Sequence, residues 1–454
     1  MKIAVPSPVV PPDNPFLNDK LKREPFANAL SNLVQSLDDP TVITINAPWG
    51  EGKTTFANMW RASLKNKGCR CIYIDAFAND YVDDPFIVLV GEIASHIQET
   101  YCTDHPIYTA VESLLKKASH AGVKLLSFGT KIGLKAATLG ILKNDDFKEM
   151  GDIKDALTND SFDFASDLIE NKLRSHRADV ASIEEFKNTL ADFAEQIKRD
   201  TSFPLILIID ELDRCRPTYA VDFIEKVKHL FSGRNIIFVL ILNKLQLAAA
   251  VSSVYGQIDS ISYLQKFFTI ETSLTKSDDI ISNDYKTFCS HIFSELNIDA
   301  GNEVGALQST MIGISEVFCL SLRDIERCYS HISLYYAAKH SFSFTPLVPL
   351  MIIIKLKDHD GYNSIRSGTS FGELQKIQAY QKLVSQNAIL IKNRINNIMP
   401  MLRFCTLPED EYKAIPDEKQ VKQYQSLLWD YNVEREEILP MLCKRLEMFK
   451  LYQA

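Results

Sequence analysis

One short stretch between a strand pattern and a helix pattern constrains this chain most. The β-branched run 41–45 predicts a strand, and the residues from Thr54 to about Lys67, before Gly68, predict a helix. The residues between these two elements include Ala47, Pro48, Trp49, Gly50, Glu51, Gly52 and Lys53. Small residues allow successive backbone N–H groups to curl around a phosphate, and the N-terminus of the helix adds partial positive charge. The stretch therefore predicts a phosphate-binding loop, or P-loop, inside an α/β domain.

The polar residues of this loop have expected roles. Lys53 is expected to reach the β- and γ-phosphates of a nucleotide, and the Thr54 hydroxyl to bind Mg²⁺. Ala47 stands where the first glycine of the motif usually lies, so the match is to the relaxed pattern. On the loop alone, a glycine turn before a helix with a surface lysine remains an alternative. The predicted nucleotide-binding residues are Ala47, Pro48, Trp49, Gly50, Glu51, Gly52, Lys53, Thr54 and Thr55.

A second motif lies where the aliphatic run 205–209 ends in Asp210 and Glu211. Such a run predicts a buried parallel strand, and two carboxylates at its end are costly unless a cation offsets them. A nucleotide-bound Mg²⁺ is such a cation. Asp210 is expected to hold the metal through water, and Glu211 to orient and deprotonate the attacking water. A core strand followed by a solvated acidic turn is the alternative, but the two motifs together favour nucleotide binding.

Asn243 ends another apolar strand pattern, 237–242, after the helix that follows the acidic pair. If that strand lies between the other two, the Asn243 side chain would point at the γ-phosphate and help to place the lytic water. Asparagine is also a common cap, and Asn243 precedes a helix that begins at Lys244. The two roles are compatible.

Three arginines are candidates for contact with the γ-phosphate. Arg214 could form an ion pair with Asp210 or Asp213, which is the simpler interpretation, or reach the nucleotide of a neighbouring subunit. Arg216 lies two residues after Arg214. In an oligomer, one of these two arginines could therefore contact the nucleotide of the neighbouring subunit. Arg323, on a predicted helix of the C-terminal region, could close over the phosphates from a lid or belong to a solvated face.

The net charge and the cysteine content indicate the cellular compartment and the kinds of partner to expect. The 454 residues carry a net charge of −8, which argues against bulk electrostatic binding to nucleic acid. The nine cysteines have no metal-ligand spacing, which indicates a reducing compartment and a cytoplasmic location. No signal peptide pattern is found at the N-terminus.

No stretch provides the roughly 20 uncharged apolar residues that a membrane span requires. The nearest is 121–142, which is interrupted by Lys124, Lys131 and Lys135. A packed helix of small residues is favoured there over an interfacial helix on a membrane surface. The apolar run 347–356 is too short to span a membrane and is expected in a core.

Alternating strand and helix patterns predict a doubly wound, mostly parallel P-loop NTPase sheet, with ligands at the carboxyl ends of the strands. The first helix is expected over residues 16–40, and a second strand over 70–74. The expected units are an extended arm (1–15), the NTPase core (16–275) with a helical insert (about 102–180), a helical lid-like region (276–345) and a C-terminal helical region for partner binding or oligomerisation (346–454).

Several of these elements together resemble the KAP-type NTPases. The resemblance rests on the loop 48–54, the aromatic and acidic segment 75–81, the acidic signature 210–217, Tyr255-Gly256 and the segment 263–268. It implies an additional-strand P-loop ATPase of the signal-transducing, AAA-like group, intracellular and mostly bacterial or membrane-associated. Many members carry transmembrane helices between the two nucleotide motifs, but the lysine-interrupted insert here argues against direct membrane insertion. Members include phage-exclusion proteins, so a role in antiviral defence is implied by the resemblance alone.

The sequence thus predicts a Mg²⁺-dependent ATPase that couples nucleotide state to assembly or signalling, as a homo-oligomer or with an effector protein. ATP is favoured over GTP because the run 243–246 begins like a guanine-binding loop but lacks its aspartate. The alternative is a nucleotide-gated scaffold that binds ATP with little turnover and recruits an effector. A DNA-directed motor is disfavoured by the acidic charge.

Overall fold

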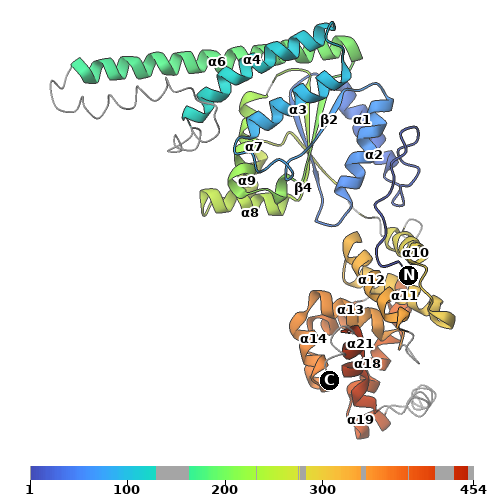
Figure 1. Ribbon diagram of the computed structural model, residues 1–454. Helices are drawn as coiled ribbons and strands as arrows, with labels where there is room; N and C mark the ends of the chain where they lie inside the picture. Colours follow the sequence, from blue (N-terminus) through green and yellow to red (C-terminus); the bar gives the residue numbers. More distant parts are fainter. Residues whose placement is uncertain are drawn as a thin grey trace.

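The chain forms an α/β lobe and a helical lobe (Figure 1). The computed structural model describes residues 2–128, 163–231, 233–274, 276, 283–338, 344–386, 388–414 and 434–447. Residues 2–15 contain no regular helix or strand. They lead from the N-terminus, which lies beside the helical lobe, to the α/β lobe (Figure 1).

A five-stranded sheet forms the centre of the α/β lobe, and all of its strand pairs are parallel. The strand order is β2-β3-β4-β1-β5, so β4 lies between β1 and β3. This strand order meets the condition that the sequence analysis set for a role of Asn243 beside the γ-phosphate. The strands are β1 (Thr41–Asn46), β2 (Cys71–Asp75), β3 (Leu205–Asp210), β4 (Ile236–Leu242) and β5 (Ile270–Ser273).

Helices cover both faces of the sheet, which confirms the predicted doubly wound α/β fold. Side chains alternate between the faces along each strand. Ile206 and Ile208 of β3 therefore pack with the first group of helices, whereas Leu207 packs with the second. The first group is α1 (Glu24–Ser36) and α2 (Lys53–Asn66). The second is α3 (Pro85–Thr100), α7 (Pro217–Leu230), α8 (Lys244–Tyr255) and α9 (Ser260–Gln265).

The insert between the two nucleotide motifs is a pair of long helices, α4 (Pro106–Phe128) and α6 (Asp163–Thr201). They lie side by side and extend beyond the sheet (Figure 1). Phe186 of α6 packs edge-on against Phe86 of α3, with ring centroids 4.9 Å apart, which fixes the base of the pair to the core. Most of the segment 121–142 lies outside the described residues. Within the described ranges, no helix is long and apolar enough to cross a membrane.

The helical lobe has one hydrophobic core, which includes residues from Tyr285 to Cys443. The boundary expected near residue 345 therefore does not separate two cores. The described helices that build this lobe are α10 (Asp284–Leu296), η5 (Gly301–Glu303), α11 (Val304–Val317), α12 (Leu322–Ala337), α13 (Leu347–Lys357), α14 (His359–Arg366), α15 (Phe371–Leu374), α16 (Gln378–Ser385), α17 (Ile389–Ile395), α18 (Ile398–Thr406), α19 (Glu409–Lys413), η6 (Arg435–Glu437) and α21 (Ile438–Leu446).

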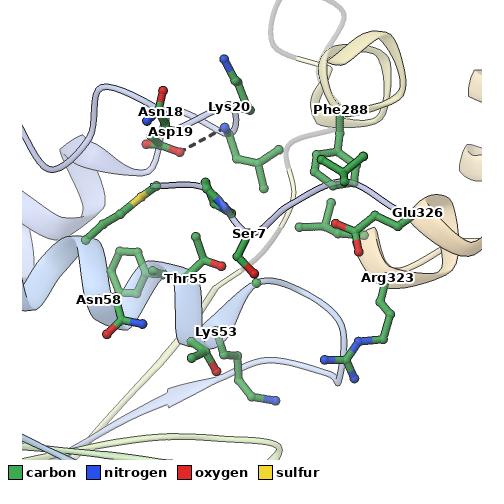
Figure 2. Close-up of a pocket in the computed structure, with 18 of the residues that line it drawn as sticks. Ser7, Asn18, Asp19, Lys20, Lys53, Thr55, Asn58, Phe288, Arg323 and Glu326 are labelled. Carbon is green, nitrogen blue, oxygen red and sulfur yellow. Dashed lines mark hydrogen bonds between the residues drawn. The ribbon is translucent and has the colours of Figure 1, made fainter. Parts of the chain in front are cut away.

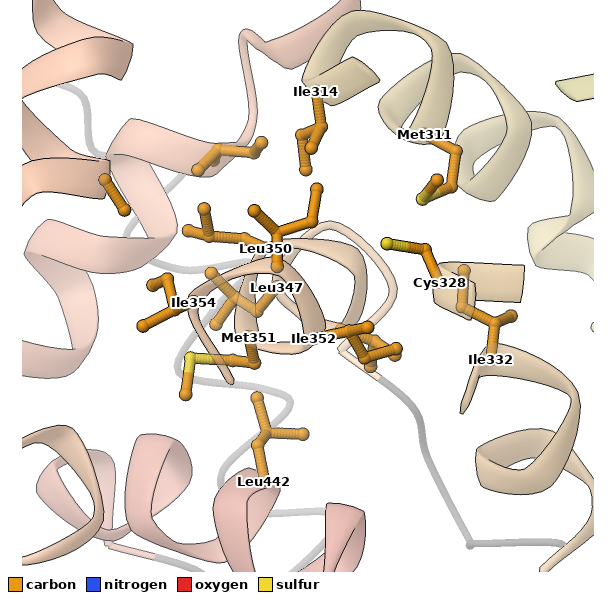
Figure 3. Packing of buried hydrophobic residues seen from close by; sticks show 14 of the residues in the cluster. Met311, Ile314, Cys328, Ile332, Leu347, Leu350, Met351, Ile352, Ile354 and Leu442 are labelled. Atoms are coloured by element: carbon orange, nitrogen blue, oxygen red, sulfur yellow. The ribbon is translucent and has the colours of Figure 1, made fainter. Parts of the chain in front are cut away.

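Helix α13 lies at the centre of this core. Figure 3 shows Leu350 and Ile352 of α13 among side chains of α11, α12 and α21. Residues 347–354 of the helix are all buried, so no polar face reveals its period. The expectation that this apolar run lies in a core is confirmed. The run alone does not tell a helix from a strand, because a helix buried on all sides resembles a buried strand in sequence.

The first helix is shorter than the sequence predicted. α1 begins at Glu24 rather than near residue 16 because Asp19 organises the preceding turn. Its carboxylate accepts hydrogen bonds from the N–H groups of Leu21 (3.1 Å), Arg23 and Glu24 (3.2 Å). Aspartate competes with the helix for backbone donors in this way. The short, half-polar edge strand β5 was not predicted at all.

Candidate functional site

The predicted P-loop joins the end of β1 to the start of α2. Its backbone turns at Gly50 (φ 85°) and Gly52 (φ 73°), both in the left-handed region that glycine adopts readily. The N–H of Ala47 donates to the carbonyl of Leu242 at the end of β4, 3.0 Å away. The glycine spacing in the sequence thus corresponds to two backbone reversals directly before a helix N-terminus, which is the geometry that favours anion binding.

Lys53 is buried at the first position of α2. Its Nζ donates to the carbonyls of Ala47 (3.0 Å) and Pro48 (3.4 Å), and lies 3.8 Å from Oδ2 of Asp213. Burial lowers the pKa of Lys53, and the charges of Asp213 and Asp210 oppose that shift. The ammonium group is therefore enclosed by the loop and faces the acidic residues that follow β3.

Asp210 is fully buried at the end of β3. It accepts hydrogen bonds from the Tyr73 hydroxyl (3.2 Å) and from the Glu211 N–H (2.9 Å). Burial raises the pKa of Asp210, whereas the neighbouring polar groups, first among them the Thr54 side chain, oppose that shift. The two residues predicted to bind Mg²⁺, Thr54 and Asp210, thus lie together. Tyr73 was not predicted, and nothing in a lone strand tyrosine indicates such a role.

Glu211 adopts a left-handed backbone conformation, with φ 60°. This conformation is uncommon for a residue with a side chain and occurs often at functional sites. Oε1 of Glu211 lies 2.9 Å from Nη1 of Arg214, and the Thr54 hydroxyl donates to the same oxygen over 3.5 Å. The predicted ion pair of Arg214 therefore forms with Glu211 rather than with Asp210 or Asp213.

The pKa of Glu211 is raised, mainly by burial. The charge of Arg214 opposes the shift, while the nearby carboxylates of Asp210, Asp75 and Asp213 add to it. A carboxylate whose pKa is moved upwards toward neutral pH is better suited to accept a proton. The environment of Glu211 is thus compatible with the base role expected from the sequence.

Asp213, which the sequence analysis named as a partner for Arg214, is also a member of the site. Its Oδ2 accepts a hydrogen bond of 2.5 Å from Nε1 of Trp49 and lies 3.8 Å from Lys53. Its Oδ1 is buried without a hydrogen-bond partner among the described residues. The acidic signature 210–217 contains this residue, so its position in the sequence was the available signal.

Asn243 lies at the end of β4, and its side chain accepts a hydrogen bond from the N–H of Leu245 (3.1 Å). It therefore caps α8 in this structure. Arg216 lies 3.4 Å from Asp83 and also contacts Asp80, both in the loop after β2. These contacts hold Arg216 against that loop.

The helical lobe reaches the P-loop through the first turn of α12. The Arg323 N–H donates to the carbonyl of Gly50, 3.1 Å away. A Cβ atom on Gly50 would lie only 2.7 Å from Oγ of Ser321 and 2.9 Å from Cβ of Arg323. Ser321 in turn forms a capping box with Asp324, which fixes the start of the helix. Arg323 is thereby placed beside the phosphate-binding loop.

A pocket of about 670 Å³ opens where these elements meet. Binding pockets for small molecules and cofactors typically have volumes of about 300–1,000 Å³. The pocket is lined by the P-loop with the start of α2, by the N-terminal arm, by α10 and by α12. Figure 2 shows Ser7 of the arm above Thr55 and Lys53, with Arg323 on the side of α12.

The oxygen atoms around Thr54 fit a magnesium ion that is shared with a nucleotide. A hydroxyl group and the carboxylates of Asp210 and Glu211 are hard donors, which Mg²⁺ prefers. The residues that the structure describes contain no group of three or more His, Cys, Asp or Glu that could hold a metal ion by themselves. Mg²⁺ commonly binds through one or two protein carboxylates plus phosphates and water, so this donor set is sufficient.

The profile of the KAP family P-loop domain matches residues 23–338. This chain belongs to the KAP family. The match confirms the resemblance inferred from the P-loop and the acidic signature, and it extends from the start of α1 to the end of α12. No curated protein matches the KAP chain.

Solved structures similar to this KAP protein include the three that follow. The Aeropyrum pernix ORC2 protein in ADPNP–ADP complexes is 11% identical, with a TM-score of 0.34 over 94% of this chain and 93% of that one. AMPPCP-bound DnaA from Aquifex aeolicus is 14% identical, with a TM-score of 0.31 over 96% of this chain and 99% of that one. CDC6P from Pyrobaculum aerophilum is 12% identical, with a TM-score of 0.34 over 99% of this chain and 98% of that one.

The contact between Gly50 and α12 predicts an unequal effect of two glycine substitutions. Gly68 also has a positive φ (81°), but a Cβ atom there would meet nothing within 4 Å. Gly68→Ala should lower the free energy of unfolding by about 1–2 kcal/mol through backbone strain alone. Gly50→Ala should cost a further ~1–3 kcal/mol because the new methyl group overpacks against Ser321 and Arg323. Denaturant unfolding of both variants measures the difference, and equal costs would contradict the tight junction.

Proposed function

We propose that this KAP protein is a Mg²⁺-dependent ATPase that couples its nucleotide state to assembly or signalling. One observation carries the proposal: Lys53 and Thr54 of the P-loop lie against the carboxylates of Asp210, Glu211 and Asp213, and Lys53, Thr54 and Glu211 also line one pocket. The loop supplies donors for the phosphates, and the carboxylates supply a metal ligand and a base. Membership of a P-loop family supports the same reaction class.

Each part of the site has a role in this proposal. The N–H groups of the loop and the Lys53 ammonium bind the β- and γ-phosphates, and Thr54 and Asp210 hold the metal ion. Mg²⁺ supplies neutralisation of phosphate charge when it is bound. Glu211 accepts a proton from the attacking water. Arg323 approaches the phosphates from α12, and Asn243 is the candidate for positioning the water from the end of β4.

ATP is the proposed nucleotide. In the guanine-binding loop of GTPases, an aspartate three residues after the asparagine pairs with the base, whereas Gln246 takes that position here. The run 243–246 also begins α8 at the end of β4, where Asn243 caps the helix. The structure and the sequence thus offer no equivalent of that loop at this place in the described residues.

A nucleotide-gated scaffold with little turnover is the second candidate, and the Glu211–Arg214 pair supports it. The proposed base is engaged by a guanidinium group 2.9 Å away, and its raised pKa is opposed by that charge. Hydrolysis requires this pair to open, so a partner or signal that moves Arg214 would control turnover. In this version the protein holds ATP until an effector protein or a second subunit binds.

The proposed cellular setting follows from the family and from the composition. A cytoplasmic homo-oligomer or effector complex in bacterial antiviral defence is proposed from the family resemblance and from the cysteine content. The net charge of −8 remains the argument against bulk binding to nucleic acid. Residues 129–142 of the lysine-interrupted segment are not described, so the choice between a packed helix and a membrane-surface helix stays a prediction.

Lys53→Ala is expected to abolish ATP binding, because the ammonium group offsets the charge of the β- and γ-phosphates. Lys65→Ala serves as the matched control, since Lys65 lies on the exposed surface near the other end of α2. Calorimetric titration with Mg²⁺ and ATP should give normal binding for Lys65→Ala. A Lys53→Ala protein that binds ATP within a few-fold of the wild type would refute the assignment of the P-loop.

Glu211→Gln is expected to keep ATP affinity and to lose turnover, because the amide preserves shape but cannot accept the proton. Loss of a general base lowers the rate by about a hundredfold or more. Steady-state phosphate release measures the rate, and calorimetry checks binding on the same preparation. An unchanged low rate in wild type and variant would favour the scaffold, whereas an unchanged high rate would assign the base elsewhere, with Asp213 the next candidate.

A further inference from the structure

Glu51 is a P-loop residue whose side chain is buried at the junction of the two lobes. Only 8% of the side chain is exposed. Its Oε1 accepts a hydrogen bond of 2.6 Å from Nζ of Lys276, and its Oε2 is buried without a hydrogen-bond partner among the described residues. A carboxylate in the loop that is proposed to bind anionic phosphates would repel them unless a cation neutralises it.

Lys276 is the cation that pairs directly with this carboxylate, and it is held by the helical lobe. The Arg23 guanidinium also interacts electrostatically with Glu51 but forms its hydrogen bond with the Glu51 carbonyl. The Lys276 side chain is 12% exposed. Nζ also donates to the carbonyl of Leu320 (2.8 Å), directly before the cap of α12, and lies 4.9 Å from the ring centroid of Tyr285 on α10. One ammonium group therefore binds the P-loop and the helical lobe at the same time.

The backbone of the same two loop residues makes further contacts. Nη1 of Arg23, directly before α1, donates to the Glu51 carbonyl (2.9 Å), and the Arg323 N–H donates to the Gly50 carbonyl (3.1 Å). Both carbonyls and the Glu51 carboxylate are thus occupied by groups from outside the loop. The position of residues 50–51 therefore depends on the position of the helical lobe, and the position of the helical lobe depends on that of these two residues.

We infer that the Glu51–Lys276 pair is a latch that ties α12 to the P-loop and makes the loop receptive to nucleotide phosphates. Lys276 is in this account a positioning residue, because it acts on the nucleotide only through Glu51. The inference rests on the proposed function for its ligand, ATP. It goes beyond that function because it assigns the communication between the phosphate site and the helical lobe to one ion pair.

The test compares ATP affinities across a pair of variants. Lys276→Met removes the cation and leaves a buried charge in the loop, so the ATP dissociation constant should rise roughly tenfold to a hundredfold, as expected for unit charges a few ångströms apart. The double variant Glu51→Gln with Lys276→Met removes the uncompensated charge, and its dissociation constant should return to within about threefold of the wild type. Calorimetric titration with Mg²⁺ and ATP measures the dissociation constants of the wild type, the single variant and the double variant.

Lys226→Met is the matched control. Lys226 forms an equally short pair of 2.6 Å with buried Asp84, and its side chain is 16% exposed, but the pair joins α7 to the start of α3 rather than to the P-loop. Loss of the Lys226–Asp84 pair should lower the free energy of unfolding about as much as loss of the Glu51–Lys276 pair, but it should leave ATP affinity unchanged. A general loss of folding would affect both single variants, so equal loss of affinity in Lys226→Met would overturn the latch.

The remaining outcomes separate the latch from the proposed function. Unchanged affinity in Lys276→Met, or a double variant that stays as weak as the single one, would refute the role of Lys276. A wild-type protein that binds no ATP would refute the proposed function. In that case, hydrogen exchange in the absence of ATP tests whether Lys276 holds α12 against the P-loop. Exchange of the backbone amides of residues 322–325 should become faster in Lys276→Met but not in Lys226→Met. Unchanged exchange would refute the latch.

Discussion

The contact between the P-loop and the first turn of α12 is the interaction on which the rest of this structure depends. The loop must place Gly50 so close to Ser321 and Arg323 that no Cβ atom fits, and its carbonyl accepts a hydrogen bond from the Arg323 N–H. The phosphate-binding loop of the α/β lobe is thus one wall of the junction with the helical lobe. Anything that changes the conformation of the loop changes the contact surface for α12.

Charge balance is the second feature of the candidate site. Three carboxylates lie at or just after the end of β3, and Lys53 and Arg214 lie among them. Burial raises the pKa values of Asp210 and Glu211 and lowers that of Lys53, because burial penalises the charged form of each group. A nucleotide with its metal ion brings both anionic and cationic groups into this cluster, and it would redistribute the ion pairs. The Glu211–Arg214 pair is the one whose opening the proposed reaction requires.

The sequence predicted the parts of the site that are local in the chain. Lys53, Thr54, Asp210 and Glu211 follow directly from short motifs at strand ends. In the structure Lys53, Thr54 and Glu211 line one pocket, and Asp210 is buried directly beside them. The position of β4 between β1 and β3 entered the sequence analysis only as a condition for the role of Asn243, since strand order depends on pairings far apart in the chain. The same short motifs carried the resemblance to the KAP family, which the match over residues 23–338 confirms.

The features that sequence reasoning missed depend on long-range contacts. Lys276 meets Glu51 across 225 positions, and Tyr73 meets Asp210 across 137. No local pattern marks either residue. Helix α13 was obscured for a different reason, because burial on all sides removes the polar face that shows a helical period. The start of α1 was misplaced because the turn around Asp19 uses side-chain acceptors instead of helical ones.

The central claim is that one loop binds the nucleotide and positions the helical lobe. Hydrogen exchange of the wild-type protein with and without Mg²⁺ and a non-hydrolysable ATP analogue tests it most directly. The account predicts slower exchange at residues 50–54 of the P-loop together with residues 322–325 of α12, over the same range of analogue concentration. Slower exchange in the loop without any change in α12 would contradict the coupling, and no change in either would contradict nucleotide binding itself.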